Sequence, residues 1–242
     1  MSSGTDPVQR LLAIVAAARR EGNGTTRGVL ARVLGSDPED DASFLRSYLN
    51  LRALFSEAVA SVQGMQEIQE ELHLVWVRPI GDAISFPNLL QQWSNAAGNL
   101  GGTVIQSLQF AAHERARYPQ EPRLDKQPLE DLLRKVETLS QEVREAELEP
   151  VVTELLLIHL ENIRQAILAY HVRGAAVLQK ALEEVVGGCV LRRDVVLAAP
   201  EKERRKFFGV VENLNKLVTL ATNLKALALP LIKLLGAGES GA

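Results

Sequence analysis

Hydrophobic positions recur along most of the chain at intervals of three and four residues, which is the spacing of one face of an α-helix. Near the N-terminus this pattern begins at Pro7, where Asp6 is the expected N-cap and proline suits the first helical position. A short helix is expected over Thr26–Leu34, ended by Gly35, and a longer one after the acidic turn at 36–41, running to about Gln63. The N-terminal region is therefore predicted to be helical.

The middle of the chain has a less regular pattern. The stretch HLVWVRP, residues 73–79, is interpreted as the end of a buried helix that stops before Pro79, because a single strand would have no pairing partner. Breaks are expected at 86–87 and in GNLGG at 98–102, followed by a helix over 103–117. Three prolines in YPQEPRLDKQP, residues 118–128, then predict a linker.

Beyond the prolines the periodicity is regular. One apolar stripe covers 129–146, and a single helix of about 37 residues, roughly 55 Å long, is expected over 150–186, with Gly174 inside it and Gly187 ending it. Its segment LLLIHL, residues 155–160, is apolar nearly all round, which predicts a helix surrounded by others. The last helix follows Pro200, and Pro230 is expected to kink or end it. Its heptad-like apolar positions are Val210, Val211, Leu214, Leu217, Val218, Ala221, Leu224 and Ala228.

These elements predict an all-α protein, a multi-helix antiparallel bundle with long central and C-terminal helices, because short loops between helices favour antiparallel neighbours. The expected division is an N-terminal helical region over 1–118, a linker over 119–127 and a helical bundle over 128–242.

Composition narrows the function classes. A net charge of -3 argues against a general nucleic-acid-binding protein. Cys189 is the single cysteine, which excludes an intramolecular disulfide and a zinc cluster of thiolates and suits a reducing cytoplasm; we expect it to be buried and inert. No secretory signal is recognised at the N-terminus, and no run of 18 apolar residues predicts a membrane span.

The block LEPVVTELLLIHLENIRQAILAYHVRGAAVLQKALEEVVG, residues 148–187, resembles a segment of uncharacterised helical proteins from GC-rich bacteria. The resemblance implies a bacterial, cytoplasmic, all-α protein. It implies no activity.

One catalytic pattern was weighed in this block. Arg164 and His171 have the Arg-x(4–6)-His spacing of HEPN-type ribonucleases, which act on RNA without a metal. A motif this short is expected about once by chance in a chain of this composition. We therefore interpret the pair as structural, with Arg164 lying along a packed flank, and keep a HEPN-type ribonuclease as the alternative hypothesis.

Metal and cofactor chemistry is not predicted. Glu70 and His73 have the spacing of half a di-iron site, but no second pair completes it. His159 lies in LLLIHL and is interpreted as a core histidine with satisfied nitrogens. GNLGGT lacks the Lys-Ser/Thr ending of a phosphate-binding loop.

The C-terminal helix is the strongest candidate for function. From 207 to 235 it is amphipathic, and its net charge over 207–238 is +2, from three lysines and one glutamate. It either closes the bundle or docks on a partner. We predict a non-enzymatic interaction protein, with a regulatory, defence or effector role in bacteria, that binds itself, a partner protein or a membrane surface; it would be cytoplasmic or peripheral to the inner membrane face. The predicted contact residues are Phe207, Phe208, Lys216, Lys225, Leu231, Ile232 and Lys233.

Overall fold

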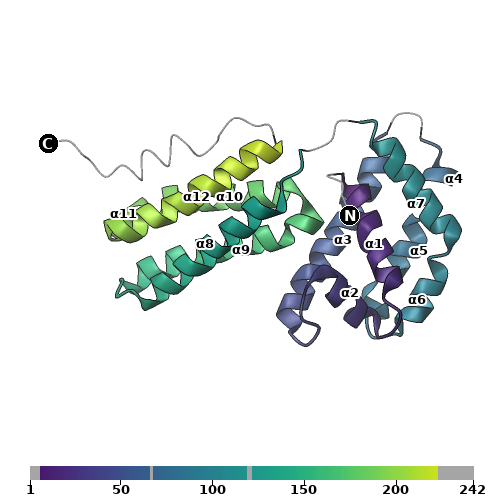
Figure 1. Cartoon of the computed structure of the whole chain (residues 1–242), viewed down its shortest axis with the longest axis horizontal. Coiled ribbons are helices and arrows are strands. Elements are labelled where there is room, and N and C mark those ends of the chain that lie inside the picture. Colours follow the sequence, from purple (N-terminus) through teal and green to yellow (C-terminus); the bar gives the residue numbers. More distant parts are fainter. Residues whose placement is uncertain (1–5, 66–67, 119–121, 223–242) are drawn as a thin grey trace. The chain divides into compact units, whose positions relative to one another are not determined.

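The computed structural model of the chain describes residues 6–65, 68–118 and 122–222 (Figure 1). The secondary-structure elements in these ranges are helices, and one isolated β-bridge joins Thr25 and Gln92. The predicted all-α fold class is confirmed. By its contacts the chain divides into two compact units: residues 1–120 with 171–174, called here the N-terminal unit, and residues 121–170 with 175–242, called the bundle.

Helices of very different length, from the four residues of α4 to the 23 of α3, build the N-terminal unit around a core rich in aromatic side chains. Helix α1 packs on α3 and α7, and the largest fully buried side chains of this core include Trp76 and Phe44. The elements are α1 (Pro7–Arg20), α2 (Thr26–Leu34), α3 (Asp41–Gln63), α4 (Glu70–His73), α5 (Val77–Ala83), the 3-10 helix Phe86–Asn88, α6 (Trp93–Asn99) and α7 (Gly102–Arg115).

Side-chain caps begin the first three helices. The Asp6 carboxylate accepts a hydrogen bond from Val8 N at 2.8 Å, Thr25 accepts from Gly28 N at 3.2 Å, and Asp40 accepts from two amides of α3. Gly35 ends α2 in the left-handed region, at φ 69°. The ends predicted for these helices are confirmed because each depends on local chemistry.

The interpretation of residues 73–79 was wrong. The helix does not stop before Pro79; α4 ends at His73, and α5 begins at Val77 with Pro79 as its third residue. Proline is tolerated in a first turn because the amides there have no intrahelical partner to lose.

The bundle is made of longer helices with aliphatic cores. Its predicted stripe on α8 is buried at Leu129, Leu132, Val136, Leu139 and Val143. The elements are α8 (Lys126–Glu145), α9 (Pro150–Arg173), α10 (Ala175–Leu191), α11 (Arg193–Ala198) and α12 (Glu201–Thr222).

The single helix expected over 150–186 was also wrong. Gly174 has φ 68° and separates α9 from α10, because a left-handed residue cannot continue a right-handed helix. Within the N-terminal unit, Arg10 stabilises this break: its Nε donates to Val172 O at 3.0 Å. Gly187 and Gly188 do not end α10, which continues to Leu191.

Candidate functional site

The C-terminal helix α12 runs antiparallel to α8 in the bundle (Figure 1). Lys206 Nζ lies 2.6 Å from Glu142 Oε2, which fixes the register of the two helices. Sixteen residues further along α12 is Thr222, and sixteen residues back along α8 is Lys126, the first residue of that helix. Because both helices rise by about 1.5 Å per residue, Thr222, the last described residue of α12, lies level with Lys126, the first residue of α8.

The apolar face of α12 is buried over this whole length. Phe207 is fully buried and Phe208 is 6 % exposed, so both belong to the core and not to the surface of the folded bundle, contrary to the contact role predicted for them. Lys216 is exposed and pairs with Glu212 at 2.9 Å. The other predicted contact residues, Lys225, Leu231, Ile232 and Lys233, lie outside the described residues, as do Leu224 and Ala228 of the heptad-like pattern.

The predicted heptad-like positions up to Ala221 are confirmed as core positions. The buried residues of α12 are Phe207, Phe208, Val210, Val211, Leu214, Asn215, Leu217, Val218 and Ala221.

A groove of about 610 Å³ lies between α8 and α12 on the bundle surface. Leu139, Gly209 and Val210 form its apolar part, and a Cβ on Gly209 would meet no atom within 4 Å. The polar lining is Asp131, Arg134, Lys135, Thr138, Glu142, Lys206 and Asn213.

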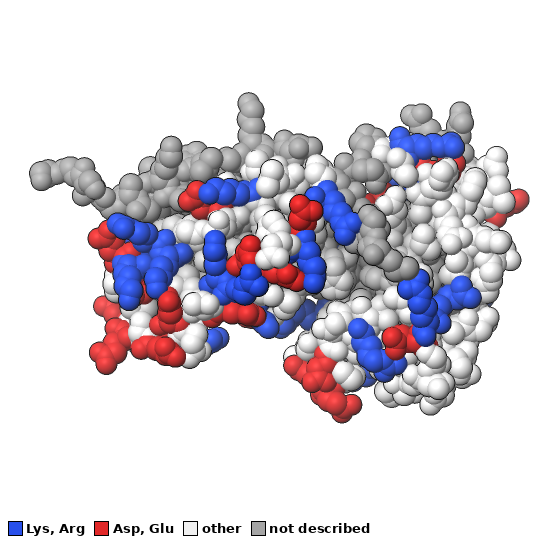
Figure 2. Space-filling model, viewed as in Figure 1, with Lys and Arg blue, Asp and Glu red and all other residues white. Residues whose placement is uncertain are grey.

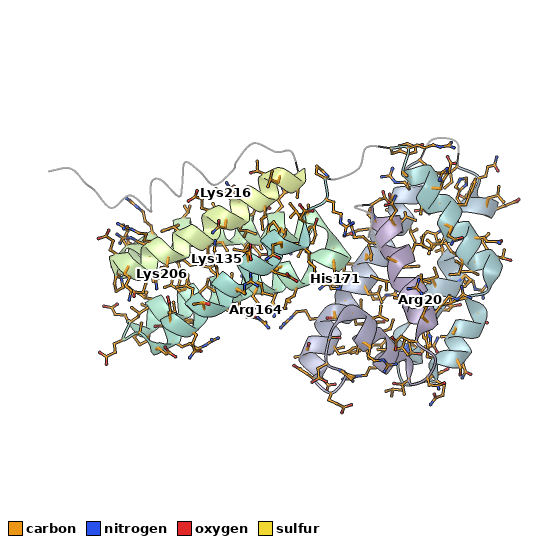
Figure 3. All side chains as sticks on the ribbon, in the orientation of Figure 1. Arg20, Lys135, Arg164, His171, Lys206 and Lys216 are labelled. Atoms are coloured by element: carbon orange, nitrogen blue, oxygen red, sulfur yellow. The ribbon has the colours of Figure 1, made fainter. Side chains whose placement is uncertain are left out.

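Opposite charges are paired within this groove. Arg134 is bonded to Asp131, and Lys206 to Glu142, while Lys135 forms no ion pair with the described residues (Figure 3). Figure 2 shows the same mixture of Lys, Arg, Asp and Glu over the visible face of the bundle. Both carboxylates of the groove, Asp131 and Glu142, are therefore paired with cations of its own lining.

Arg164 and His171, the residues of the ribonuclease hypothesis, both lie on α9 but differ in their surroundings. Arg164 is held on the bundle surface by Glu161 at 3.4 Å and Glu137 at 3.7 Å. His171 is exposed and falls in the N-terminal unit by its contacts. The guanidinium is thus already engaged by two carboxylates of the chain.

His159 is a core residue, as predicted, but the prediction that its ring nitrogens are hydrogen-bonded was wrong. It is 5 % exposed, and neither of its ring nitrogens has a hydrogen-bond partner among the described residues. Burial lowers the pKa of this imidazole, nearby Arg192 lowers it further, and Glu184 opposes them. The ring lies against Gly188, where a Cβ would be 2.6 Å from His159 Nε2, and beside Phe207, with ring centroids 6.2 Å apart.

Cys189 is buried, as predicted. Burial raises the pKa of its thiol to about 12, so the nucleophilic thiolate is scarce at neutral pH.

The half di-iron site suggested by Glu70 and His73 is not assembled in the structure. His73 is buried, and its Nδ1 lies 2.8 Å from Gln69 O, within its own turn. No group of three or more potential metal ligands occurs among the described residues. Across the same ranges, no helix combines the length and hydropathy that crossing a membrane requires.

The outer face of α9 is a feature that the sequence reasoning missed. LLLIHL predicted a helix covered on all sides, yet Ile158 is 46 % exposed, Val151 43 % and Leu168 42 %. The signal was present in the sequence as apolar residues on every side of the helix, but it was interpreted as burial within this chain.

No protein-family model, curated protein or solved structure matches this chain.

Proposed function

We propose that this chain is a non-enzymatic interaction protein, and that its contact segment is the sequence after Thr222. The segment, residues 223–235, would bind a second copy, a partner protein or a membrane surface. The observation that carries the proposal is the end of α12: its apolar face is buried as far as Ala221, where α8 has reached its first residue.

The sequence beyond Thr222 supports a contact role. NLKALALPLIKLL, residues 223–235, contains two lysines and no acid, and its apolar residues continue the heptad-like spacing. In the register of α8 and α12, Thr222 is level with Lys126, where α8 begins, so α8 offers no further residues for this apolar sequence to pack on. Apolar sequence that continues past the helix it packs on is a candidate for an association surface.

The chemistry of the described bundle supports the non-enzymatic half of the proposal. Its buried cysteine is protonated at neutral pH, and Arg164 is paired with glutamates. A metal-independent ribonuclease built on Arg164 and His171 is kept as the alternative hypothesis. The resemblance of residues 148–187 supports a bacterial setting, and the single cysteine supports a cytoplasmic one.

Truncation after Thr222 tests the proposal. The shortened chain and the full chain would be compared by light scattering for self-association, by pull-down with labelled bait for protein partners, and by flotation with vesicles of phosphatidylcholine or of phosphatidylcholine with phosphatidylglycerol. We expect the full chain to be positive in at least one assay and the shortened chain to lose that signal.

A matched control uses the two lysines of the segment. Lys225→Gln with Lys233→Gln removes both charges but keeps the apolar residues, so binding that depends on anionic lipid falls while apolar association persists. Equal behaviour of the full and shortened chains in all three assays contradicts the proposed function.

A further inference from the structure

Two exposed stretches of the chain share the end of the bundle where α8 finishes and α12 begins. Lys206 of α12 pairs with Glu142 of α8, so the turn that follows α8 and the short helix α11 that precedes α12 lie at this same end (Figure 1). Thr222, after which the proposed contact segment begins, is at the other end of α12. The surface is therefore separate from the start of that segment.

Apolar side chains of both stretches are exposed at this end. Leu191, the last residue of α10, is 87 % exposed, more than any other large apolar side chain among the described residues. Val190 and Leu197 beside it are exposed as well, and so is Val151, next to the turn after α8. Single exposed apolar residues are ordinary on a protein surface. A group of them at one end of a bundle is typical of an interaction surface.

The two stretches carry opposite charges. Residues 143–149, called here the glutamate stretch, hold three acids and one base, a net charge of -2. Residues 190–205, called the arginine stretch, hold five bases and three acids, a net charge of +2. No ion pair among the described residues joins one stretch to the other. Exposed charged residues without an ion pair in the described part of the chain include Glu145, Glu147, Glu149, Arg192 and Arg193.

Hydrogen bonds order the backbone of both stretches. In the arginine stretch, Arg204 Nη1 donates to Leu197 O at 3.1 Å and to Ala199 O at 3.4 Å. In the glutamate stretch, Leu148 N donates to Ala146 O at 2.9 Å. Contact surfaces that are already ordered lose little conformational entropy when a partner binds.

We propose that the protein pairs with a second copy of itself through this end, the arginine stretch of each copy lying on the glutamate stretch of the other. Because the two net charges are equal and opposite, a two-fold axis makes both contacts favourable at once. Pairing also covers Leu191 and Val151 of both copies. The inference goes beyond the proposed function, since it assigns a second contact surface and names its partner.

A second copy fits this end better than an anionic membrane or a nucleic acid does. Either of these would attract the arginine stretch but would be repelled by the glutamate stretch beside it. A single ion pair on a surface contributes little. The two-fold arrangement forms each charge contact twice and adds the apolar contacts of Leu191, which together favour a specific pair.

Charge reversal in the full chain tests the pairing. Arg192→Glu with Arg193→Glu makes both stretches acidic, and Glu145→Lys with Glu147→Lys makes both basic. Each variant alone should pair with itself at least about tenfold more weakly than the parent does, because both contacts become repulsive. Sedimentation equilibrium measures this as the balance between the 26.5 kDa monomer and its dimer.

Mixing the two variants is the decisive arm of this experiment. An acidic copy and a basic copy attract each other at both contacts, so the mixture should recover the affinity of the parent to within about threefold. Damage to the fold of either variant cannot produce such a recovery. A high salt concentration, about 1 M, should weaken the parent dimer, because exposed charges are then screened.

Leu191→Ser tests the apolar part of the contact without changing a charge. Its side chain is almost fully exposed, so the substitution should leave the fold intact and weaken pairing about tenfold. The matched control is Leu90→Ser in the N-terminal unit, where the leucine is 81 % exposed, and it should leave pairing unchanged. These two variants decide the matter if a charge-reversed chain does not fold.

The outcomes separate this inference from the proposed function. A parent that is monomeric at about 100 μM, variants that pair as tightly as the parent, or a mixture that stays monomeric overturns the inference and leaves the segment after Thr222 untouched. Weakening by each variant and recovery in the mixture support it. If that recovery occurs but truncation after Thr222 changes none of the three binding assays, the pairing stands and the proposed function is wrong.

Discussion

The two units of the chain achieve closed cores by different means. Both tryptophans, Trp76 and Trp93, lie buried in the N-terminal unit, where side-chain hydrogen bonds such as Tyr48 Oη to Ile84 O at 3.0 Å join its elements. The bundle has no tryptophan and buries mainly leucine, valine and alanine on long helices. Aromatic side chains and specific hydrogen bonds position the helices of the N-terminal unit, whereas repeated aliphatic contact positions those of the bundle.

Glycine also has different roles in the two units. Gly35 and Gly174 of the N-terminal unit are left-handed and end helices. Gly188 of the bundle is inside a helix, where its lack of a side chain makes room for His159. Backbone conformation explains the first kind, and packing explains the second. Each role can be tested by a pair of glycine-to-alanine substitutions. Because both tryptophans lie in the N-terminal unit, tryptophan fluorescence reports the unfolding of that unit alone.

Gly174→Ala is expected to have the largest effect. The left-handed backbone costs about 1 kcal/mol or more for alanine, and the new Cβ would lie 2.5 Å from Arg10 Nη1, displacing a buried guanidinium that bonds Val172 O. We expect a total loss of about 3 kcal/mol of unfolding free energy, measured by denaturant titration with tryptophan fluorescence.

The control for this substitution is Gly35→Ala, which has nearly the same φ but no atom within 4 Å of the added Cβ. It should cost only about 1 kcal/mol. Equal losses for the two variants would show that Arg10 contributes nothing to the break between α9 and α10.

Gly188→Ala is expected to destabilise the bundle by about 2 kcal/mol, because its Cβ overlaps the buried imidazole of His159. Gly187→Ala, one residue away, meets no atom within 4 Å and should be neutral or stabilise by up to about 1 kcal/mol through helix propensity. Circular dichroism during urea unfolding checks both. Similar values for the two neighbours would contradict the packing explanation.

Acid should destabilise the bundle through His159. Burial depresses the pKa of this histidine in the folded chain, whereas the unfolded chain binds a proton near pH 6.5. As pH falls below about 6.5 the unfolded state gains a proton that the folded state does not, so stability falls until the folded state is protonated as well.

His159→Leu removes this titration, so the loss of unfolding free energy between pH 7 and pH 5 should become smaller. His113→Leu, the same substitution at an exposed position of α7, is the matched control. A pH dependence identical in the parent and His159→Leu would exclude His159 as its source.

Arg164→Ala should have the smallest effect, below about 1 kcal/mol, because its ion pairs with Glu137 and Glu161 are on the surface. The same variant tests the ribonuclease alternative. Labelled RNA with EDTA should remain uncut by the parent, by Arg164→Ala and by His171→Ala. Cutting by the parent that both variants lose would favour the alternative.

The sequence predicted those features of the fold that depend on interactions within about one helical turn, and it failed where distant residues decide. Caps and breaks such as Asp6 and Gly35 act within one turn, and the start of α1 and both ends of α2 were predicted to the residue. Gly174, Gly187 and Gly188 were misjudged, because which glycine breaks a helix depends on Arg10 and His159, far away in sequence.

The candidate site was less predictable. Periodicity identified the apolar face of α12, but it could not tell whether Phe207 and Phe208 are core residues or contact residues. That distinction requires the register set by Lys206 and Glu142, a contact 64 residues apart in sequence. The exposed face of α9 was not predicted for a similar reason, because apolar residues on every side of a helix do not show which side is buried.

The central claim is that the bundle is complete at Thr222, which leaves the following apolar residues available for contact. Its most direct test is the unfolding free energy of the chain ending at Thr222, measured beside the full chain by circular dichroism in urea. We predict a difference below about 1 kcal/mol, because the buried residues of α12 are all retained. A loss of about 3 kcal/mol or more would show that the later residues complete the core, and would contradict the account.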